Sequence, residues 1–411
     1  MRFSLNIQIV IAAAIGITGG FILSVLGPAF GLRNETLYIC DLLGNILVGL
    51  LKMILIPLIF CTITLGIAHL RVHKKMKRVW QVALIFFLST PAIASLLGLI
   101  AVNVFKPGKG SHINMLSQLA SNVHISSLSL SEFGMSFVTG LFMNPFQAVA
   151  QGQILPTIVF AIFLGIALIH LGDSRAKTVL SFLKEFLELI MLIIGWVMRF
   201  LPIGIAALLL KLVATQNANL LSSMGTFMAV VIGATLFHGF VILPLILFIF
   251  TKYHPLAFLK GMKDALITAF STSSSSATLP VTLRCIEENL KVDKNIAGFV
   301  APLGATVNMD GTALYEAIAA IFVANLVGIN LNIIQQIIVF IMAILGSIGA
   351  PGIPSAGMVT MVMVLQSVGL PAEAIAILLP IDRILDAFRT MVNVEGDAIG
   401  SLIVQRYVGR S

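Results

Sequence analysis

Charged residues are scarce in this chain: Lys, Arg, Asp and Glu make up 10% of its 411 residues, whereas hydrophobic residues make up 58%. Together with a mean hydropathy of +1.06, this scarcity excludes a soluble domain and indicates a polytopic membrane protein. The net charge of +8 is not a nucleic-acid signal, because the Lys and Arg residues gather in a few short loops without interleaved aromatic residues, as the positive-inside rule expects.

Cysteines are equally few. Cys40, Cys61 and Cys285 lie in or near apolar segments without metal-ligand spacing, which excludes a disulfide framework and a zinc site. The first apolar run, MRFSLNIQIVIAAAIGITGG, lacks an A-x-A cleavage site and continues into further apolar sequence. We therefore interpret it as the first membrane span and not as a cleaved signal peptide.

Long hydrophobic runs are what the chain has in abundance. They lie near residues 6–29, 38–69, 80–106, 136–170, 178–214 and 223–251. A spanning helix needs about 20 apolar residues, so the longer runs predict tilted or broken helices. The loop from Arg71 to Arg78 carries five Lys and Arg residues, against one in the preceding loop. This bias places that loop and both termini in the cytoplasm.

Two later segments have apolar arms too short to span a membrane. The first runs from Pro255 to Asn295, has basic residues at both ends and turns at STSSSSATLP (271–280). The second has arms at 333–345 and 358–369 and turns at GSIGAPGIPSAG (346–357). We expect re-entrant hairpins that enter from opposite sides with cavity-lining tips, as in inverted-topology repeats. The alternative is a set of ordinary spans with flexible glycines.

A polar stripe interrupts the last apolar segment, at IDRILDAFRTMVNVEGD (381–397). In a helix, six polar residues would lie within an arc of about 100°: Asp382, Asp386, Arg389, Thr390, Asn393 and Asp397. Ionisable groups at membrane depth persist where they face a cavity, a partner or an ion path. The alternative is that the acids simply pair with Arg389 and Arg383, but such pairing does not need Thr390 or Asn393. We therefore interpret the stripe as a binding surface.

A second polar interruption lies between the two hairpins. Asn308, Met309, Asp310 and Gly311 break an otherwise apolar helix over 301–325. Freed carbonyls, together with the oxygens of Asn308, Asp310 and Asp397, suit a hard cation such as sodium, and discontinuous helices recur in transporters. The alternative is that this segment only kinks the helix. A kink would need Gly311 but not the buried Asp310.

These segments together resemble the glutamate transporters, the dicarboxylate/amino-acid:cation symporter family, over nearly the whole chain. The motifs that carry the resemblance are PGKG (107–110), NPFQAVAQGQILPTIVFAIFLGIA (144–167), PIG (202–204), STSSSSATLPVT (271–282), GATVNMDGTALYEA (304–317), SIGAPGIPSAG (347–357) and DRILDAFRTMVNVEGD (382–397). The short outer loops resemble those of prokaryotic members, which implies the plasma (inner) membrane.

The resemblance implies an all-α fold of eight transmembrane helices and two re-entrant hairpins, a homotrimer and an elevator-type alternating-access mechanism. The resemblance divides the chain into four parts: a scaffold part at 1–78, a core helix with an outer loop at 79–135, a second scaffold part at 136–222 and the transport core at 223–411. Within the transport core it implies a hairpin at 256–294, a helix at 295–328, a second hairpin at 331–370 and a last helix at 372–406.

The resemblance also implies a substrate site. Its residues are Ser274, Ser275, Thr312, Ile353 to Gly357, Asp386, Arg389, Thr390 and Asn393. The planar fork of Arg389 suits a side-chain carboxylate, Asp386 suits an ammonium group, and the N–H groups of the first tip suit the main-chain carboxylate. A C4-dicarboxylate would leave Asp386 buried and unpaired, and a neutral amino acid would do the same to Arg389. We therefore expect aspartate or glutamate as substrate, with the other two classes as alternatives.

For cations, the resemblance implies three sodium sites and one proton carrier. The first sodium site is Gly304, Asn308, Asn393 and Asp397; the second is Thr306, Met309 and the carbonyls of Ser347, Ile348 and Ala350; the third is Asn308, Asp310, Phe87 and Thr90. Pro91 stands where the archaeal pattern has a hydroxyl, so the third site is expected to lack that ligand. Glu316 matches the proton-carrying position of animal members, the alternative being a Glu hydrogen-bonded in place. Ser273 and Ala387 stand where members have an extra arginine next to the aspartate, so that interaction is expected to be missing.

Two other classes compete with a carrier. A serine hydrolase needs a base beside its nucleophile, and the seven histidines lie mostly at span ends and loops outside the motifs, so we expect no enzyme. An anion channel is the second alternative, but two tips around a site matched to a zwitterion favour occlusion of the substrate.

Overall fold

The computed structural model describes residues 5–27, 30–68, 77–110, 139, 141–151, 153–215, 218–350, 352 and 354–408. These residues are nearly all helical and include no β-strand, which confirms the all-α class. Most of the basic loop at 71–78 and the outer stretch at 111–135 lie outside the described residues.

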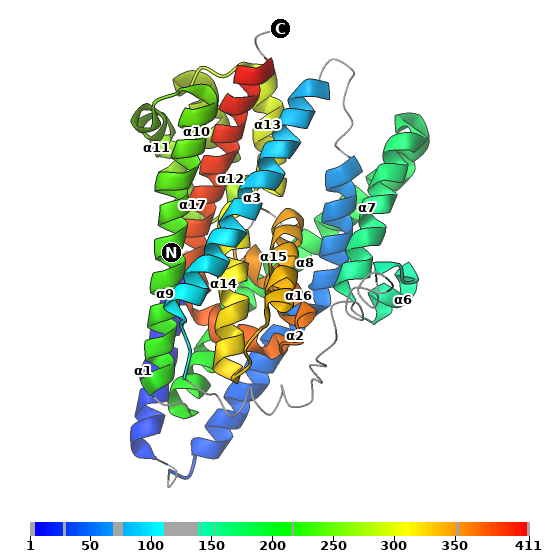
Figure 1. Ribbon diagram of the computed structural model, residues 1–411. Helices are drawn as coiled ribbons and strands as arrows, with labels where there is room; N and C mark the ends of the chain where they lie inside the picture. The colour runs from blue at the N-terminus through cyan, green and yellow to red at the C-terminus, as the bar shows by residue number, and fades with distance from the viewer. Residues whose placement is uncertain are drawn as a thin grey trace.

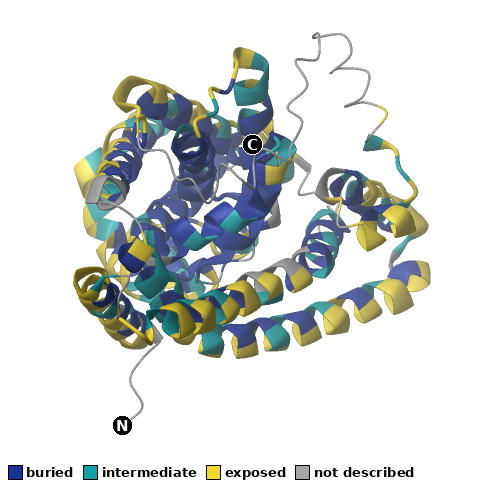
Figure 2. Ribbon diagram, turned by 90° about the horizontal axis from the view of Figure 1, so that it is seen from below, coloured by how far each residue is buried: buried dark blue, intermediate teal, exposed yellow. Residues whose placement is uncertain are grey.

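The apolar surface of the helices is that of a membrane protein. Within the described residues, five helical segments are long and apolar enough to cross a membrane: Ile7–Leu26, Arg78–Phe105, Ser174–Thr215, Ser222–Thr251 and Lys294–Val327. Large hydrophobic side chains such as Phe21, Val25 and Tyr38 are more than 60% exposed. In water such a surface would be a liability, whereas a bilayer covers it. Buried residues gather in the interior and the outer helix faces are exposed (Figure 2).

One layer of the molecule is built on a long helix, α8 (Asp173–Thr215). Its 43 residues extend for about 65 Å at 1.5 Å per residue, so it must tilt or project beyond a bilayer core of about 30 Å. Helices α1 (Leu5–Leu26) and α2 (Arg33–Ala68) pack along it. A Cβ at Gly16 would lie 2.7 Å from the carbonyl oxygen of Ala206, so glycine permits the close approach of α1 and α8. The predicted run at 136–170 is divided into α6 (Pro145–Ala150) and α7 (Ile154–Leu171).

The other helices surround α14 (Asp310–Val327), whose residues are all buried except Asn325. The helices that pack against it are α3 (Lys77–Phe105), α9 (Ala218–Phe237), α15 (Ile333–Gly349), α16 (Ala356–Ser367) and α17 (Ile375–Val408). Segments η2 (His238–Ile242), α10 (Leu243–Thr251) and η4 (Ala372–Ala374) complete this part. Figure 1 shows α6 and α7 at one edge of the molecule and α9 to α11 at the other, with α14, α15 and α16 between them.

Two antiparallel helix pairs correspond to the predicted hairpins. The first consists of α11 (Pro255–Thr272) and α12 (Ser275–Arg284), which continues as η3 (Cys285–Asn289); the second consists of α15 and α16. The first tip is far shorter than the predicted 271–280, because only Ser273 and Ser274 leave the helical path. Ser274 caps α12 by accepting from the N–H of Ala277 at 3.1 Å, and Ser271 donates back to the Ile267 carbonyl. The hydroxyls thus satisfy helix ends and do not unwind them.

The two tips touch each other. Ser274 Oγ donates to the Gly352 carbonyl at 2.7 Å, and the backbone N–H of Ser276 donates to the same oxygen at 3.0 Å. The Gly352 carbonyl thus accepts two hydrogen bonds from the first tip, and these bonds hold the two hairpin tips together.

Candidate substrate and cation site

The predicted break between the hairpins is confirmed. Helix α13 (Lys294–Val307) ends, Asn308 and Met309 have non-helical backbones, and α14 begins at Asp310. Just beyond the break, Gly311 lies against α17, because a Cβ there would be 2.7 Å from the Cα of Arg389. The N–H of Gly311 donates to Asn393 Oδ1 at 2.8 Å. Glycine therefore allows the unwound segment to contact the polar stripe.

The six polar residues of the stripe lie on one helix, α17, and all are buried. Arg389 is fully buried, and none of the other five is more than 6% exposed. A polar pocket with about 230 Å³ of space borders three of them, Asp386, Thr390 and Asn393. It is lined by Ser273, Ser275, Met309, Thr312, Gly352, Ala356, Gly357, Asp386, Thr390 and Asn393. Of the predicted substrate residues, Ser274 bonds across the tips beside this cavity, and Ile353 lies outside the described residues.

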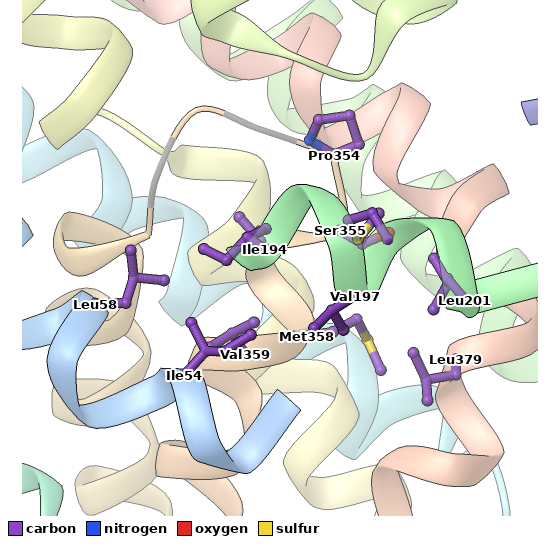
Figure 3. Close-up of a pocket in the computed structure, with 12 residues that line it drawn as sticks. Ile54, Leu58, Ile194, Val197, Leu201, Pro354, Ser355, Met358, Val359 and Leu379 are labelled. Atoms are coloured by element: carbon purple, nitrogen blue, oxygen red, sulfur yellow. The ribbon is translucent and has the colours of Figure 1, made fainter. Parts of the chain in front are cut away.

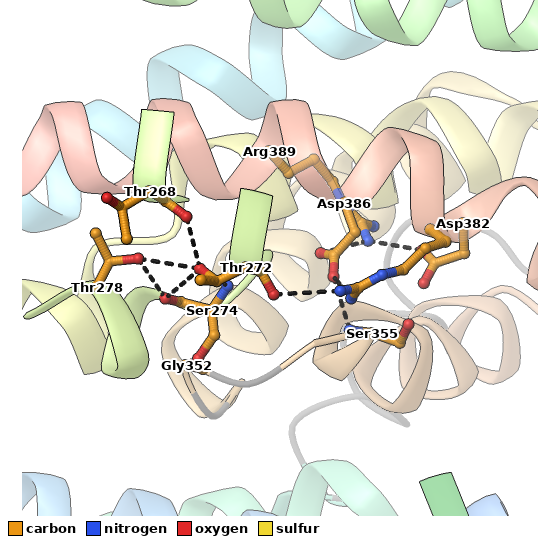
Figure 4. Close-up of polar contacts among 10 residues, drawn as sticks. Thr268, Thr272, Ser274, Thr278, Gly352, Ser355, Asp382, Asp386 and Arg389 are labelled. Atoms are coloured by element: carbon orange, nitrogen blue, oxygen red, sulfur yellow. Dashed lines mark hydrogen bonds and ion pairs between the residues drawn. The ribbon is translucent and has the colours of Figure 1, made fainter. Parts of the chain in front are cut away.

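Arg389 lies directly behind the wall of this pocket, next to the lining residue Gly357. Its Nη2 donates to Asp382 Oδ1 at 2.6 Å and to Asp386 Oδ1 at 2.8 Å (Figure 4). Its guanidinium carbon lies 4.1 Å from the centroid of the Tyr315 ring, which adds a cation–π contact. Nε and Nη1 are buried and have no hydrogen-bond partner among the described residues. Nη1 faces Gly357, where a Cβ would come within 3.2 Å of it. Nη1 is thus a buried donor behind the pocket wall at Gly357, where a ligand oxygen could accept from it.

Asp386 already has partners without a substrate. Its Oδ2 accepts from the Ser355 N–H at 2.7 Å and lies 3.7 Å from Nη1 of Arg383. The expected absence of a second arginine was therefore wrong: Arg383, one turn earlier on α17, supplies it. The expectation that a C4-dicarboxylate would leave Asp386 unpaired was wrong for the same reason. Internal pairing of the acids with both arginines is present, but it does not use the two remaining donors of Arg389.

The predicted first cation site is brought together around Asp397. Asn308 Nδ2 donates to Asp397 Oδ1 at 3.3 Å, and any side chain at Gly304 would collide with that carboxylate. Asp397 is 1% exposed, and no Lys, Arg or His side chain pairs with it in the described part of the chain. A buried carboxylate without a counter-ion is costly, so these oxygens fit a hard cation.

The third predicted site shares Asn308 with the first. Thr90 Oγ1 donates to Asn308 Oδ1 at 3.0 Å, and the Phe87 side chain is fully buried nearby. Asp310 Oδ2 lies 3.0 Å from His238 Nε2, and its Oδ1 has no partner among the described residues. His238 was not expected here. The signal was available, since it is an ionisable residue within the apolar run at 223–251, and it stands at a π-helical turn, a feature frequent at functional sites.

The second predicted site is only partly assembled. Met309 packs with Ala350 and Ala356, and α13 contacts α15. Ser347 is buried near the C-terminal end of α15, and Ile348 follows it. The last carbonyls of a helix have no intrahelical donors, which suits a cation. Thr306, however, is exposed and donates to the Leu303 carbonyl of its own helix at 2.9 Å.

Glu316 is fully buried on α14. It accepts a hydrogen bond from the Thr360 hydroxyl of α16, while its Oε2 has no partner among the described residues and lies close to Gly346 of α15. An acidic group thus joins the break helix to both arms of the second hairpin.

These features define a polytopic membrane protein with a broken helix and a polar pocket between its two helix pairs. Residues 5–407 match the sodium:dicarboxylate symporter family, and the chain belongs to that family. Its relatives include mouse excitatory amino acid transporter 3, which is 34% identical with 98% of this chain and 86% of the relative covered. Human neutral amino acid transporter B(0) is 35% identical, with 98% and 80% covered. Human excitatory amino acid transporter 3 is 36% identical, with 88% and 78% covered. The resemblance inferred from the motifs is confirmed.

Proposed function

We propose that this protein is a secondary active transporter that moves acidic amino acids, aspartate or glutamate, together with sodium. The observation that carries the proposal is the buried guanidinium of Arg389, which has two donors without a partner among the described residues and lies behind a polar pocket at Gly357. A buried donor without a partner costs about 1–3 kcal/mol. The side-chain carboxylate of an acidic amino acid would accept a charge-assisted hydrogen bond from Nη1.

The other substrate groups also find partners. Asp386 in the cavity wall would accept the ammonium group, with Thr390, Asn393 and Thr312 as neutral hydrogen-bonding neighbours. The main-chain carboxylate would meet the N-terminus of α12, where separation of the tips frees the N–H of Ser276 from Gly352. The relatives comprise excitatory and neutral amino acid transporters by name. Arg389 favours the acidic class for this chain, because a neutral substrate leaves its fork unsatisfied.

Sodium would be the co-transported cation at the three predicted sites. The Asp397 carboxylate, buried without a cationic partner among the described residues, supports the first site most directly. The partnerless Oδ1 of Asp310 supports the third. At the first and third sites a cation would neutralise a buried carboxylate that has no Lys or Arg partner among the described residues.

The two parts of the fold suggest an elevator-type movement of core against scaffold. The proposed scaffold is 1–78 and 136–222, and the proposed core is 79–135 and 223–411, with re-entrant hairpins, cytoplasmic termini and a homotrimeric assembly. An apolar cavity of about 450 Å³ lies between α2 and α8 on one side and α16 with its preceding tip on the other (Figure 3). Its apolar lining supports sliding, since no ion pair has to break there.

Filling that cavity should slow movement without removing the substrate site. Val197→Trp places a large ring on α8 against the second hairpin. We expect sodium-dependent aspartate binding to stay within about threefold and uptake to fall about tenfold or more, because overpacking resists movement of a packed interface. Val179→Trp, at an exposed position of α8, is the matched control. Unchanged uptake by Val197→Trp would argue against movement at this interface.

Purified protein in proteoliposomes tests the function as a whole. An inward sodium gradient should drive concentrative uptake of labelled aspartate or glutamate, and collapse of the gradient should stop it. Uptake that only equilibrates would indicate a channel. Sodium-driven uptake of succinate or alanine in preference to both acids would reject the proposed substrate.

Glu316 is proposed as a proton carrier in the same cycle. Thr360 is its hydrogen-bond donor, and Tyr315, which precedes it on α14, lies against the guanidinium of Arg389. Glu316→Gln keeps the size of the side chain and its acceptor but removes the ionisable group. We expect uptake by this variant to lose the pH dependence of the wild type between pH 5 and 8, while sodium dependence persists. If the pH profile stays that of the wild type, Glu316 is only hydrogen-bonded in place.

A further inference from the structure

The site contains a second buried cation that the motifs did not assign. Arg383 is 8% exposed and stands one turn before Asp386 on α17. Its Nη1 lies 3.7 Å from Asp386 Oδ2, and its Nη2 donates at 3.2 Å to the carbonyl oxygen of Thr272. Thr272 ends α11, directly before the first tip. The side chain is therefore held between the binding helix and the first hairpin.

The charges around Arg383 balance. Asp382 and Asp386 carry two negative charges, and Arg383 and Arg389 carry two positive ones. Both acids use a single nitrogen of Arg389, Nη2. If Arg389 were the only cation, it would have to balance both buried carboxylates, Asp382 and Asp386, because a buried charge needs a partner. Its remaining N–H donors would then be drawn to these two acids. With Arg383 beside Asp386, the fork keeps Nε and Nη1 unused.

We propose that Arg383 is a specificity-determining positioning residue: it balances the Asp382 and Asp386 carboxylates so that Arg389 stays available for the side-chain carboxylate of an acidic substrate. The inference rests on the proposed function, and it adds a residue that acts through its neighbours without touching the substrate. An acidic amino acid brings a net negative charge into a cluster that is neutral only while Arg383 is present. A neutral amino acid brings none.

Aspartate and asparagine separate this effect from general damage, because they have nearly the same shape and differ by one charge. We expect Arg383→Gln to weaken sodium-dependent aspartate binding by about tenfold or more, since like charges then meet in a buried site. Asparagine binding should change by less than about threefold, so discrimination between the two ligands should fall. Arg383→Lys, which restores the charge, should recover most of the aspartate affinity.

The measurement is calorimetric or fluorescence titration of the purified full-length protein with each amino acid in saturating sodium. Arg406→Gln, at the far end of the same helix, is the matched control and should behave as the wild type. A sodium-induced rise in melting temperature in each variant shows that the fold and the cation sites persist. If asparagine binds too weakly to measure, the test is whether Arg383→Lys recovers the aspartate affinity that Arg383→Gln loses. Recovery supports the proposed role of Arg383, and no recovery contradicts it.

The outcomes are distinct. If the wild type does not prefer aspartate to asparagine, the proposed function is wrong and this inference fails with it. If the wild type prefers aspartate and Arg383→Gln keeps that preference, only the role of Arg383 is wrong. Equal losses for both ligands, without recovery by lysine, would make Arg383 a purely structural tether of the first hairpin.

Discussion

Replacing Arg389 with cysteine should abolish uptake of acidic amino acids. The substitution removes the buried cation behind the pocket wall. It leaves Asp386 with Arg383 and takes from Asp382 its ion-pair partner Arg389. Losing one partner of a buried charge pair costs about 2–5 kcal/mol, and tenfold corresponds to about 1.4 kcal/mol. We therefore expect a fall in aspartate uptake of about 100-fold or more, measured as kcat/KM in proteoliposomes under a fixed sodium gradient.

The same variant should gain activity toward neutral amino acids. Without the guanidinium, a neutral side chain no longer leaves a buried cation unpaired, while Asp386 remains in the cavity wall for the ammonium group. Sodium-driven uptake of serine or alanine by Arg389→Cys would also show that the variant folds. Arg389→Lys keeps the charge but not the fork and should retain only a small part of aspartate uptake. Wild-type aspartate uptake by Arg389→Cys would contradict the proposed site.

Local patterns in the sequence were sufficient for much of this site. The stripe from Asp382 to Asp397 follows from helical periodicity, and the break at Asn308 follows from polar residues within an apolar run. Both depend on neighbours within a few turns, so they are visible before the chain is folded. The extent of the first tip was harder to predict, because serine hydroxyls can cap a helix as readily as they can line an unwound loop.

Contacts between distant segments could not be read in the same way. The pairing of His238 with Asp310 joins residues 72 positions apart, and the bond from Arg383 to Thr272 spans 111. No periodicity encodes which helix faces which. The second arginine illustrates the problem. The motif positions Ser273 and Ala387 do not carry it, yet Arg383, three positions before Asp386 on α17, lies beside the Asp386 carboxylate. A charged group that a site needs can thus come from a position outside the motif.

Asp397 carries the second large effect, on sodium coupling. Asp397→Asn keeps an oxygen that can accept from Asn308 Nδ2 and removes only the charge. A cation bound at the buried carboxylate loses its main electrostatic partner, worth about 4 kcal/mol for a pair at 4 Å in an effective dielectric of 20. We expect the sodium concentration for half-maximal aspartate binding to rise about tenfold or more, with aspartate affinity at saturating sodium much less affected.

Stability provides an independent measurement of the same site. Sodium that binds only the folded protein raises the melting temperature in proportion to the logarithm of its concentration over its Kd. Asp397→Asn should therefore melt at a higher temperature than the wild type without sodium, because no unbalanced charge is buried, and should gain less when sodium is added. Asp264→Asn, at an exposed acid paired with Arg284, should follow the wild type in both respects. A variant at Asp397 that keeps the full sodium-dependent shift would mean that the cation binds elsewhere, and that the buried carboxylate is neutralised by a proton.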